Sequence, residues 1–419
     1  MSEQSHDILN DREYRQTMIK PYLDQGLWVI TCKANIPGIH KNLFYTHLIL
    51  SYYQPLLDAL KPIDKWRHEG SDGETLVYVF KDGNPQQMKN QMVSWEETKP
   101  YGRLVDIDVY SGLSGSIRRK SLRRCLLCDN DAFSCGRNQT HPLKELLAKI
   151  DQIALEDTQK LLLACLDAAI MDELNLDPKF GLVTPISNGS HFDMNYHTML
   201  SAKDAILPYF GQMFAHGWQA HHEEQLFQKA RSIGLEAETA MFQATKGINA
   251  YKGLIFNLGL MSSAFAYVIT HQAPLKTMFP TIATMTKNLI KDFEEPKTTA
   301  GYEAYLKYRT MGARGEAMNG FPTVQQLIPM LNDFNDLTLL KVLIEAIKMT
   351  EDTVLIRRAG SYDMAKKIQS WFFNIDVSDS EALMQLTKRC IEANISFGGA
   401  ADLLVCAILY CRLAKTFAF

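Results

Sequence analysis

The sequence lacks a strong charge of either sign. Its 419 residues carry a formal net charge of −3, and the balance is +1 up to residue 153 and −4 after it. A domain that binds nucleic acid normally carries a marked positive balance along one face or helix. Charge therefore argues against nucleic acid as the partner of either half.

An apolar signal-peptide core is also missing, because the first residues, MSEQSHDILNDREYRQ, are polar and charged. Without such a signal, the eight cysteines are expected to be reduced thiols or metal ligands rather than a disulfide framework. We therefore expect a cytoplasmic protein.

The longest stretch without Lys, Arg, Asp or Glu is residues 253–275, and its length is close to the ~20 residues that a membrane span needs. Asn257, His271 and Pro274 interrupt it, and amphipathic segments flank it. We therefore expect a buried core helix and no membrane contact.

No glycine- and serine-rich linker and no solenoid repeat divides the chain, although its length suggests two or three domains. Up to about residue 140, runs rich in β-branched residues alternate with helical patterns and turns; afterwards nearly every segment has helical periodicity. The sequence predicts a mixed α/β (α+β) N-terminal domain, residues 1–153, followed by a larger all-α C-terminal domain, residues 154–419.

A pair of carboxylates lies in the strand-like run RLVDIDVY. Asp106 and Asp108 are two residues apart, so a strand places them on one face, about 7 Å apart. Such a pair can hold Mg²⁺ for transfer at phosphorus, and the basic run RRKSLRR at 118–124 can receive a polyphosphate. A solvated strand face and a solvated basic surface are the alternatives.

A cysteine and histidine cluster follows the basic run. Cys125, Cys128, Cys135 and His141 supply three thiols and one imidazole, a donor set that suits tetrahedral zinc. Only the first pair has the spacing of a zinc knuckle. Reduced structural thiols and a nucleophilic cysteine remain alternatives.

The N-terminal half resembles a known family in three places: NIPGIHK at 35–41, the Gly102–Arg103 pair, and RCLLC…CGR…H. It is similar there to the citrate lyase holo-acyl-carrier synthase, also called apo-citrate lyase phosphoribosyl-dephospho-CoA transferase, over most of residues 7–152. The resemblance implies transfer of a phosphoribosyl-dephospho-CoA unit from its triphosphate to a serine of the citrate lyase acyl carrier (gamma) subunit, with release of pyrophosphate.

That reaction implies attack of the carrier serine on the α-phosphate, with Mg²⁺ on Asp106 and Asp108 supporting the leaving pyrophosphate. The expected phosphate contacts are Lys41, Arg103, Arg119 and Arg124.

The C-terminal half has no Walker A sequence, but five segments break its helical periodicity with glycine, proline and charge. Each alone is typical of a loop and a helix cap, while together they indicate one site that handles phosphate. Adjacency of Ser190, His191 and Asp193 does not predict a hydrolase triad, since neighbours in sequence lack triad geometry. The segments are 178–194, 245–253, 312–322, 351–360 and 394–404.

These segments, including PKFGLV, NGSHFDM, TKGINAYKG, GARGEA and SFGGAADLL, resemble the triphosphoribosyl-dephospho-CoA synthase family over about residues 155–415. Phe180 and Phe397 stand where that family usually has proline, and Tyr251 where it usually has histidine.

The synthase resemblance implies that ATP is joined to 3'-dephospho-CoA by displacement of adenine, which requires negative charge near a ribose that gains oxocarbenium character. The expected carboxylates are Asp193 and Glu316 at the reacting ribose, with Asp352 or Asp402 as a metal ligand or base. The expected phosphate-binding residues, which would act with Mg²⁺, are Lys179, Ser190, His191, Lys246, Lys252, Arg314 and Arg357.

Two alternatives remain open. The same chemistry could serve the carrier of malonate decarboxylase, which uses the same prosthetic group. The N-terminal half could instead be a zinc-binding adaptor on a nucleotide-binding helical domain, as RRKSLRR beside CLLC suggests. Its near-neutral charge and the absence of aromatic residues within the basic run argue against an adaptor for nucleic acid.

Overall fold

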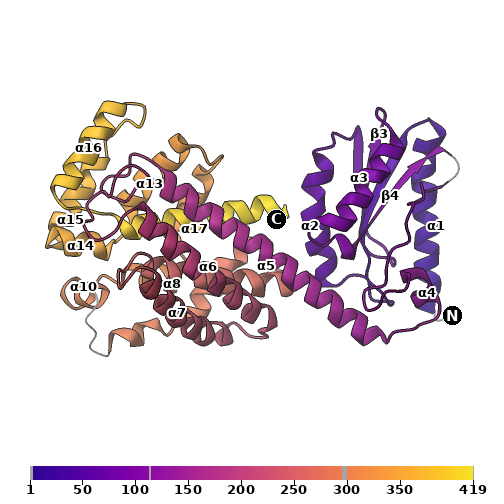
Figure 1. The fold of residues 1–419 in the computed structure, drawn as a ribbon, viewed down its shortest axis with the longest axis horizontal. Helices are drawn as coiled ribbons and strands as arrows, with labels where there is room; N and C mark the ends of the chain where they lie inside the picture. The colour runs from indigo at the N-terminus through magenta and orange to yellow at the C-terminus, as the bar shows by residue number, and fades with distance from the viewer. Residues whose placement is uncertain (1–2, 113–114, 295–299, 419) are drawn as a thin grey trace. The chain divides into compact units, whose positions relative to one another are not determined.

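The computed structural model describes residues 3–112, 115–294 and 300–418 (Figure 1). They divide into two compact units, one formed by the chain up to residue 161 together with the residues from 415 on, and the other by residues 162–414. The sequence YSGLSGS after the Asp106 and Asp108 strand is typical of a turn, and its residues 113 and 114 lie outside the described part of the chain.

The first unit is built on a four-stranded antiparallel sheet with strand order β2-β3-β1-β4. The strands are β1 (Trp28–Ala34), β2 (Asp64–His68), β3 (Thr75–Phe80) and β4 (Val105–Ser111). The helices are α1 (Glu3–Asp24), α2 (Phe44–Asp58), α3 (Pro85–Thr98), α4 (Ala132–Arg137) and the first part of α5 (Leu143–Asn175), with a 3-10 turn at Gly102–Leu104.

Alternation along the strands separates the two faces of this sheet. One face packs Val29, Val77 and Val79 against Ile19 of α1. The opposite face carries Ile30, Cys32 and Ile107, all fully buried, toward α2 and α3. The expected mixture of helices and strands is confirmed, whereas β2 and α3 were not foreseen. Strand β2 is largely exposed and polar, so it has no apolar alternation to reveal it.

The second unit is helical throughout the residues that the structure describes, as predicted. Its helices are the last part of α5, then α6 (Tyr196–Gln219), α7 (Glu224–Ala244), α8 (Lys252–Thr270), α9 (Met278–Thr286), α10 (Ala300–Tyr308), α11 (Gly312–Met318), α12 (Pro322–Leu327), α13 (Asp336–Met349), α14 (Thr353–Ala359), α15 (Tyr362–Gln369), α16 (Ser380–Glu392) and α17 (Gly398–Phe417), with 3-10 turns at Leu275–Thr277, Leu289–Phe293, Ile328–Met330 and Ser370–Phe372. The two helical patterns expected at 141–153 and 155–174 form one continuous helix, α5.

Helix α8 lies at the centre of this unit and packs against α6 and α7. A side chain at Gly217 of α6 would meet the backbone oxygen of Ser263 at 2.4 Å, so glycine allows this close approach. By length and composition α8 could cross a membrane, yet 78% of its apolar window is buried within the fold. The prediction of a buried core helix is confirmed, as for a soluble protein.

Candidate functional site

Strand β4 places Asp106 and Asp108 on the sheet face that α1 covers. They lie opposite Lys33 and Thr31 of β1 in the antiparallel register. The carboxylates line a polar pocket of about 400 Å³. Four cations also line it: Arg12, Arg15, Lys33 and Lys41.

Asp72 organises the cations of this pocket. Its buried carboxylate accepts hydrogen bonds from Arg12 (2.8 Å), Arg15 (2.9 Å) and Lys33 (2.7 Å). Burial alone would raise the pKa of Asp72, but these three hydrogen bonds hold the pKa well below its usual range. The four cations of the pocket are matched in number by Glu13, Asp72, Asp106 and Asp108, so the pocket offers cations to an anionic ligand without a net positive charge. Sequence patterns do not reveal the group around Asp72, because its members are scattered between residues 12 and 72.

The carboxylates of Asp106 and Asp108 repel each other, and a bound cation would reduce this repulsion. Burial and the neighbouring Asp106 raise the pKa of Asp108, against the opposing effect of Lys89. Lys89 of α3 donates to Asp108 Oδ1 at 3.3 Å and to the Ile107 carbonyl at 2.8 Å. Two carboxylates together with water and substrate oxygens are a usual environment for Mg²⁺.

The four predicted phosphate contacts are placed differently from one another. Lys41 lines the cationic pocket, and its ammonium donates to the Ile36 carbonyl at 2.5 Å. Arg119 lines a second pocket, of about 680 Å³, and pairs with Glu96 and Glu97. Arg103 donates to the carbonyls of Arg124 and Cys125, while the Arg124 side chain is exposed. Arg103 therefore holds the loop that carries the cysteines.

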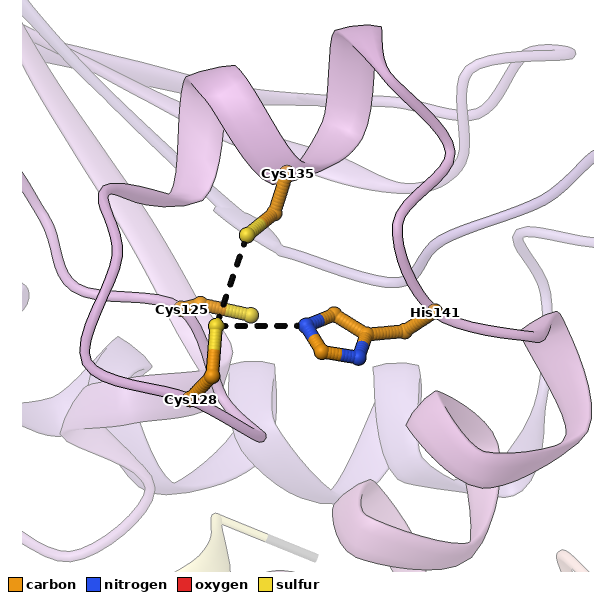
Figure 2. A group of neighbouring side chains, drawn as sticks. All are labelled: Cys125, Cys128, Cys135 and His141. Atoms are coloured by element: carbon orange, nitrogen blue, oxygen red, sulfur yellow. Dashed lines mark hydrogen bonds between the residues drawn. The ribbon is translucent and has the colours of Figure 1, made fainter.

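Cys125, Cys128, Cys135 and His141 converge, as Figure 2 shows. Their ligand atoms all lie within 4.8 Å of one another; Cys128 Sγ is 3.5 Å from Cys135 Sγ and 3.3 Å from His141 Nε2. Tetrahedral zinc with Zn–S bonds of about 2.3 Å separates its ligands by about 3.7 Å. The cluster therefore could hold a metal ion, and among the described residues it is the only such group of histidine, cysteine and acidic side chains.

All five glycine- and charge-rich segments of the helical unit meet at one cavity of about 230 Å³. Among its lining residues are five carboxylates and two lysines, which makes it acidic. The charged residues are Glu173, Glu316, Glu351, Asp352, Asp402, Lys179 and Lys252.

Asp402 directly follows the first turn of α17 and extends toward the start of α8. A Cβ atom at Gly253 would lie 2.3 Å from Asp402 Oδ2, so glycine makes room for the carboxylate. Burial, followed by the charges of Asp352 and Glu173, raises the pKa of Asp402 well above its ordinary value. Asp402 is therefore a group that retains a proton more strongly than an ordinary aspartate.

Asp352 joins two helices at the cavity wall. Its Oδ1 accepts from the backbone N–H groups of Val354 and Leu355 and caps α14. Its Oδ2 accepts from the N–H groups of Gly399 (2.8 Å) and Ala400 (3.4 Å) at the start of α17. Its oxygens are thus occupied by backbone donors, which favours a positioning role for Asp352.

Two other charged groups of the cavity are also held by protein partners. Glu316 accepts from the Thr323 hydroxyl at 2.6 Å and the Thr323 N–H at 3.2 Å. Burial raises the pKa of Glu316 despite these hydrogen bonds. Lys179 is 1% exposed and pairs with Glu173 at 2.9 Å, so its ammonium is committed to the end of α5.

Comparison with known proteins agrees with this arrangement. Residues 3–157 match the family model of apo-citrate lyase phosphoribosyl-dephospho-CoA transferase, and residues 160–418 match that of ATP:dephospho-CoA triphosphoribosyl transferase. "Protein CitXG" of Haemophilus influenzae is 31% identical over 96% of this chain and 95% of its own. "Protein CitXG" of Leuconostoc mesenteroides is 31% identical over 97% and 96%. The chain belongs to the CitXG family.

Members of this family combine two transferases, so the chain is a bifunctional enzyme for the citrate lyase prosthetic group. Its helical part also resembles a "Probable 2-(5''-triphosphoribosyl)-3'-dephosphocoenzyme-A synthase" of Lactiplantibacillus plantarum, which is 37% identical over 57% of this chain and 92% of its own. The expected resemblance of both halves is confirmed.

Several predicted residues of the synthase half lie outside the acidic cavity. Asp193 and Lys246 are exposed and do not line it. Arg314 lines a neighbouring pocket and pairs with Asp292, and Arg357 lines another beside Glu303. Lys252 lines the acidic cavity but is paired with Glu238 at 2.7 Å.

The loop that carries Ser190 and His191 is fixed by hydrogen bonds. Ser190 donates to the Ile395 carbonyl at 2.5 Å, and His191 Nε2 lies 3.0 Å from the Ser396 hydroxyl. Arg358 donates to the carbonyls of Ser190 and Asn394, and it lies 3.1 Å from His191 Nδ1. Burial and then Arg358 lower the pKa of His191 to about 4, so the imidazole is neutral at physiological pH.

The raised pKa of Asp402 predicts a pH-dependent effect on stability. Because the folded protein binds this proton more tightly than the unfolded chain, stability falls as pH rises from the ordinary aspartate pKa toward the raised one. Asp402→Asn removes that penalty, so its melting temperature should exceed that of the parent above pH 7. The gain should vanish as the pH approaches about 4. Thermal melting across pH measures this.

The matched control is Asp193→Asn, the same change at an exposed carboxylate. It should leave the melting temperature unchanged at every pH. Destabilisation by Asp402→Asn above pH 7 would show instead that an ionised Asp402 stabilises the fold.

Proposed function

We propose that the helical unit makes 2'-(5''-triphosphoribosyl)-3'-dephospho-CoA from ATP and 3'-dephospho-CoA, and that the N-terminal unit attaches it to the acyl carrier subunit of citrate lyase. The observation that carries this division is the contrast between an acidic cavity in the helical unit and a pocket in the N-terminal unit where four cations lie beside Asp106 and Asp108. The boundary between the activities, placed at 153/154 by the sequence pattern, would lie within α5.

The charge of the acidic cavity suits the first reaction. The 2'-oxygen of dephospho-CoA attacks C1' of the ATP ribose while the bond to N9 of adenine breaks, and positive charge develops on the sugar. With Asp402 protonated, four carboxylates against two lysines provide the negative field that stabilises such a centre. The triphosphate would enter as its Mg²⁺ complex, which reduces its repulsion from these carboxylates.

Within this cavity we assign proton transfer to Asp402 and Glu316. Asp402 holds a proton because of its raised pKa, so it can donate to the departing adenine. Glu316 is oriented by Thr323 and can accept the proton of the attacking hydroxyl. Lys252 would contact phosphate after exchanging its pairing with Glu238. Asp352 and Lys179 would hold in place the segments of α17 and α5 that form the wall of the cavity.

For attachment, Asp106 and Asp108 would hold Mg²⁺, and the metal would stabilise the leaving pyrophosphate. Arg12, Arg15 and Lys33 of the cationic pocket are better placed for its phosphates than the basic run at 118–124. We therefore add these three residues to the phosphate contacts expected from sequence, because they lie beside the carboxylate pair, although each is paired with Asp72 as Arg119 is with Glu96 and Glu97.

A coupled assay tests the division of labour. Purified protein with ATP, Mg²⁺ and labelled dephospho-CoA should release adenine and label added apo-carrier. Asp106→Asn should reduce carrier labelling at least ~100-fold, because a metal ligand is lost, and should leave adenine release unchanged. Asp402→Asn should lose adenine release. It should still label the carrier when preformed triphosphate intermediate is supplied. Loss of both activities in either variant would argue against separate sites.

We also propose that Cys125, Cys128, Cys135 and His141 hold structural zinc. Four soft or borderline ligands with no open position are typical of such sites. Metal analysis should find one zinc per chain, and Cys135→Ser should lose it and lower the melting temperature of the N-terminal unit, because structural zinc contributes directly to folding. Cys165→Ser, a cysteine outside the cluster, should retain the metal. Equal metal content in both variants would contradict the assignment.

The identity of the carrier is tested by offering two of them. We propose the gamma subunit of citrate lyase and a cytoplasmic location, in keeping with the apo-citrate lyase named by the family. Labelling of a malonate decarboxylase carrier in preference to the citrate lyase carrier would select the alternative.

A further inference from the structure

Two polar side chains of α8 and its N-terminal cap line the acidic cavity without a protein partner. Asn257 is 1% exposed and Tyr251 is 5% exposed. Within the described residues, the buried Oδ1 atom of Asn257 and hydroxyl of Tyr251 have no hydrogen-bond partner. Leaving a buried polar atom unpaired costs about 1–3 kcal/mol, so native proteins rarely do so without a ligand or water.

The other polar side chains of the α8 interior show that this is not a general property of the helix. Ser262 donates to the Leu258 carbonyl at 2.7 Å, and Ser263 donates to the Met213 carbonyl at 3.4 Å. Both serines are fully buried and neither lines the cavity. The unpaired atoms are therefore those of the side chains that face the space where substrate would enter.

The chemistry of an amide narrows the choice of ligand. Asparagine presents one acceptor and one donor side by side, and this pair matches the N6 amino group and N7 of adenine. A triphosphate offers only acceptors and would leave the Asn257 oxygen unpaired. The surrounding carboxylates would also repel it.

We propose that Asn257 recognises the adenine of ATP, the base that is expelled, through a paired contact to N6 and N7. The inference rests on the proposed synthase role of this cavity. As the C1'–N9 bond breaks, its electron pair moves onto the purine, and the proton released from the attacking 2'-hydroxyl is finally taken up by adenine. A donor at N7 strengthens during this step, so Asn257 would lower the barrier as well as select the base. The Tyr251 hydroxyl would form a hydrogen bond with another polar atom of the same nucleoside.

The test compares nucleotides in full-length Asn257→Leu, which preserves volume but removes the amide. For the parent enzyme, kcat/KM for base release should favour ATP over GTP, because guanine places an acceptor where Asn257 needs a donor. In the variant, kcat/KM for ATP should fall about 10–100-fold, the effect of one paired contact. The kcat/KM for GTP should change far less, so the preference for ATP over GTP should become smaller. Part of the loss with ATP should appear in kcat. If GTP is not turned over, its inhibition constant replaces kcat/KM.

Two controls keep the result interpretable. Ser262→Ala changes a buried polar residue of the same helix outside the cavity and should retain selectivity. The melting temperature of Asn257→Leu establishes folding, and the smaller Asn257→Ala, which also removes the amide, replaces it if folding fails.

Three outcomes would overturn the inference. Equal losses with ATP and GTP would make Asn257 a structural residue. A raised KM for dephospho-CoA with normal use of ATP would assign the amide to the other adenine. Unchanged kcat/KM values with both nucleotides would mean that water satisfies the amide. Absence of adenine release by the parent enzyme would instead refute the proposed synthase function, which separates the two failures.

Discussion

The carboxylate of Asp352 ties the start of α14 to the start of α17, and the acidic cavity depends on that connection. Four backbone N–H groups from two helices converge on it. A Cβ atom at Gly399 would lie 2.9 Å from this carboxylate, so the glycine is required by the contact. With α17 held there, Asp402 reaches the backbone of α8 at Gly253. One buried acid therefore positions another.

The grouping of these buried acids is electrostatically unfavourable. Asp402 feels both Asp352 and Glu173, and Glu316 feels Glu351. Folding alone gives no reason to gather these acids, since like charges in a low-dielectric space destabilise one another. Chemistry at a sugar carbon that becomes positive does give a reason. The N-terminal unit is arranged differently, because three cations surround Asp72 beside the carboxylate pair, where the proposed attachment reaction would receive a polyphosphate.

Sequence patterns located most elements and the segments of the synthase site, but not the direction of each side chain. The strand at Asp106 and Asp108 follows from period-two alternation, and glycine with charge marked all five cavity segments. Adjacent Arg357 and Arg358 of α14 show the limit, because one lines a pocket near Glu303 and the other fixes the His191 loop. Glu173 and Asn257 were missed because they lie in regular helices, where a polar residue looks unremarkable without knowledge of its neighbours.

Side chains from several segments of the chain meet at strand β4 and together form the site around Asp106 and Asp108. Strand β4 is an edge strand of the sheet, and its outer backbone groups are paired: Ile107 with the side chains of Lys89 and Glu96, Val105 with that of Arg123, and the Val109 carbonyl with the Ile117 N–H. No further strand covers this edge in the described residues, so Asp106 and Asp108 border both the cationic pocket and the larger one. In-line displacement at phosphorus requires the nucleophile and the leaving group on opposite sides. Under the proposed function, the two pockets that share this carboxylate pair would receive the carrier serine and the leaving pyrophosphate, with pyrophosphate assigned to the cationic pocket.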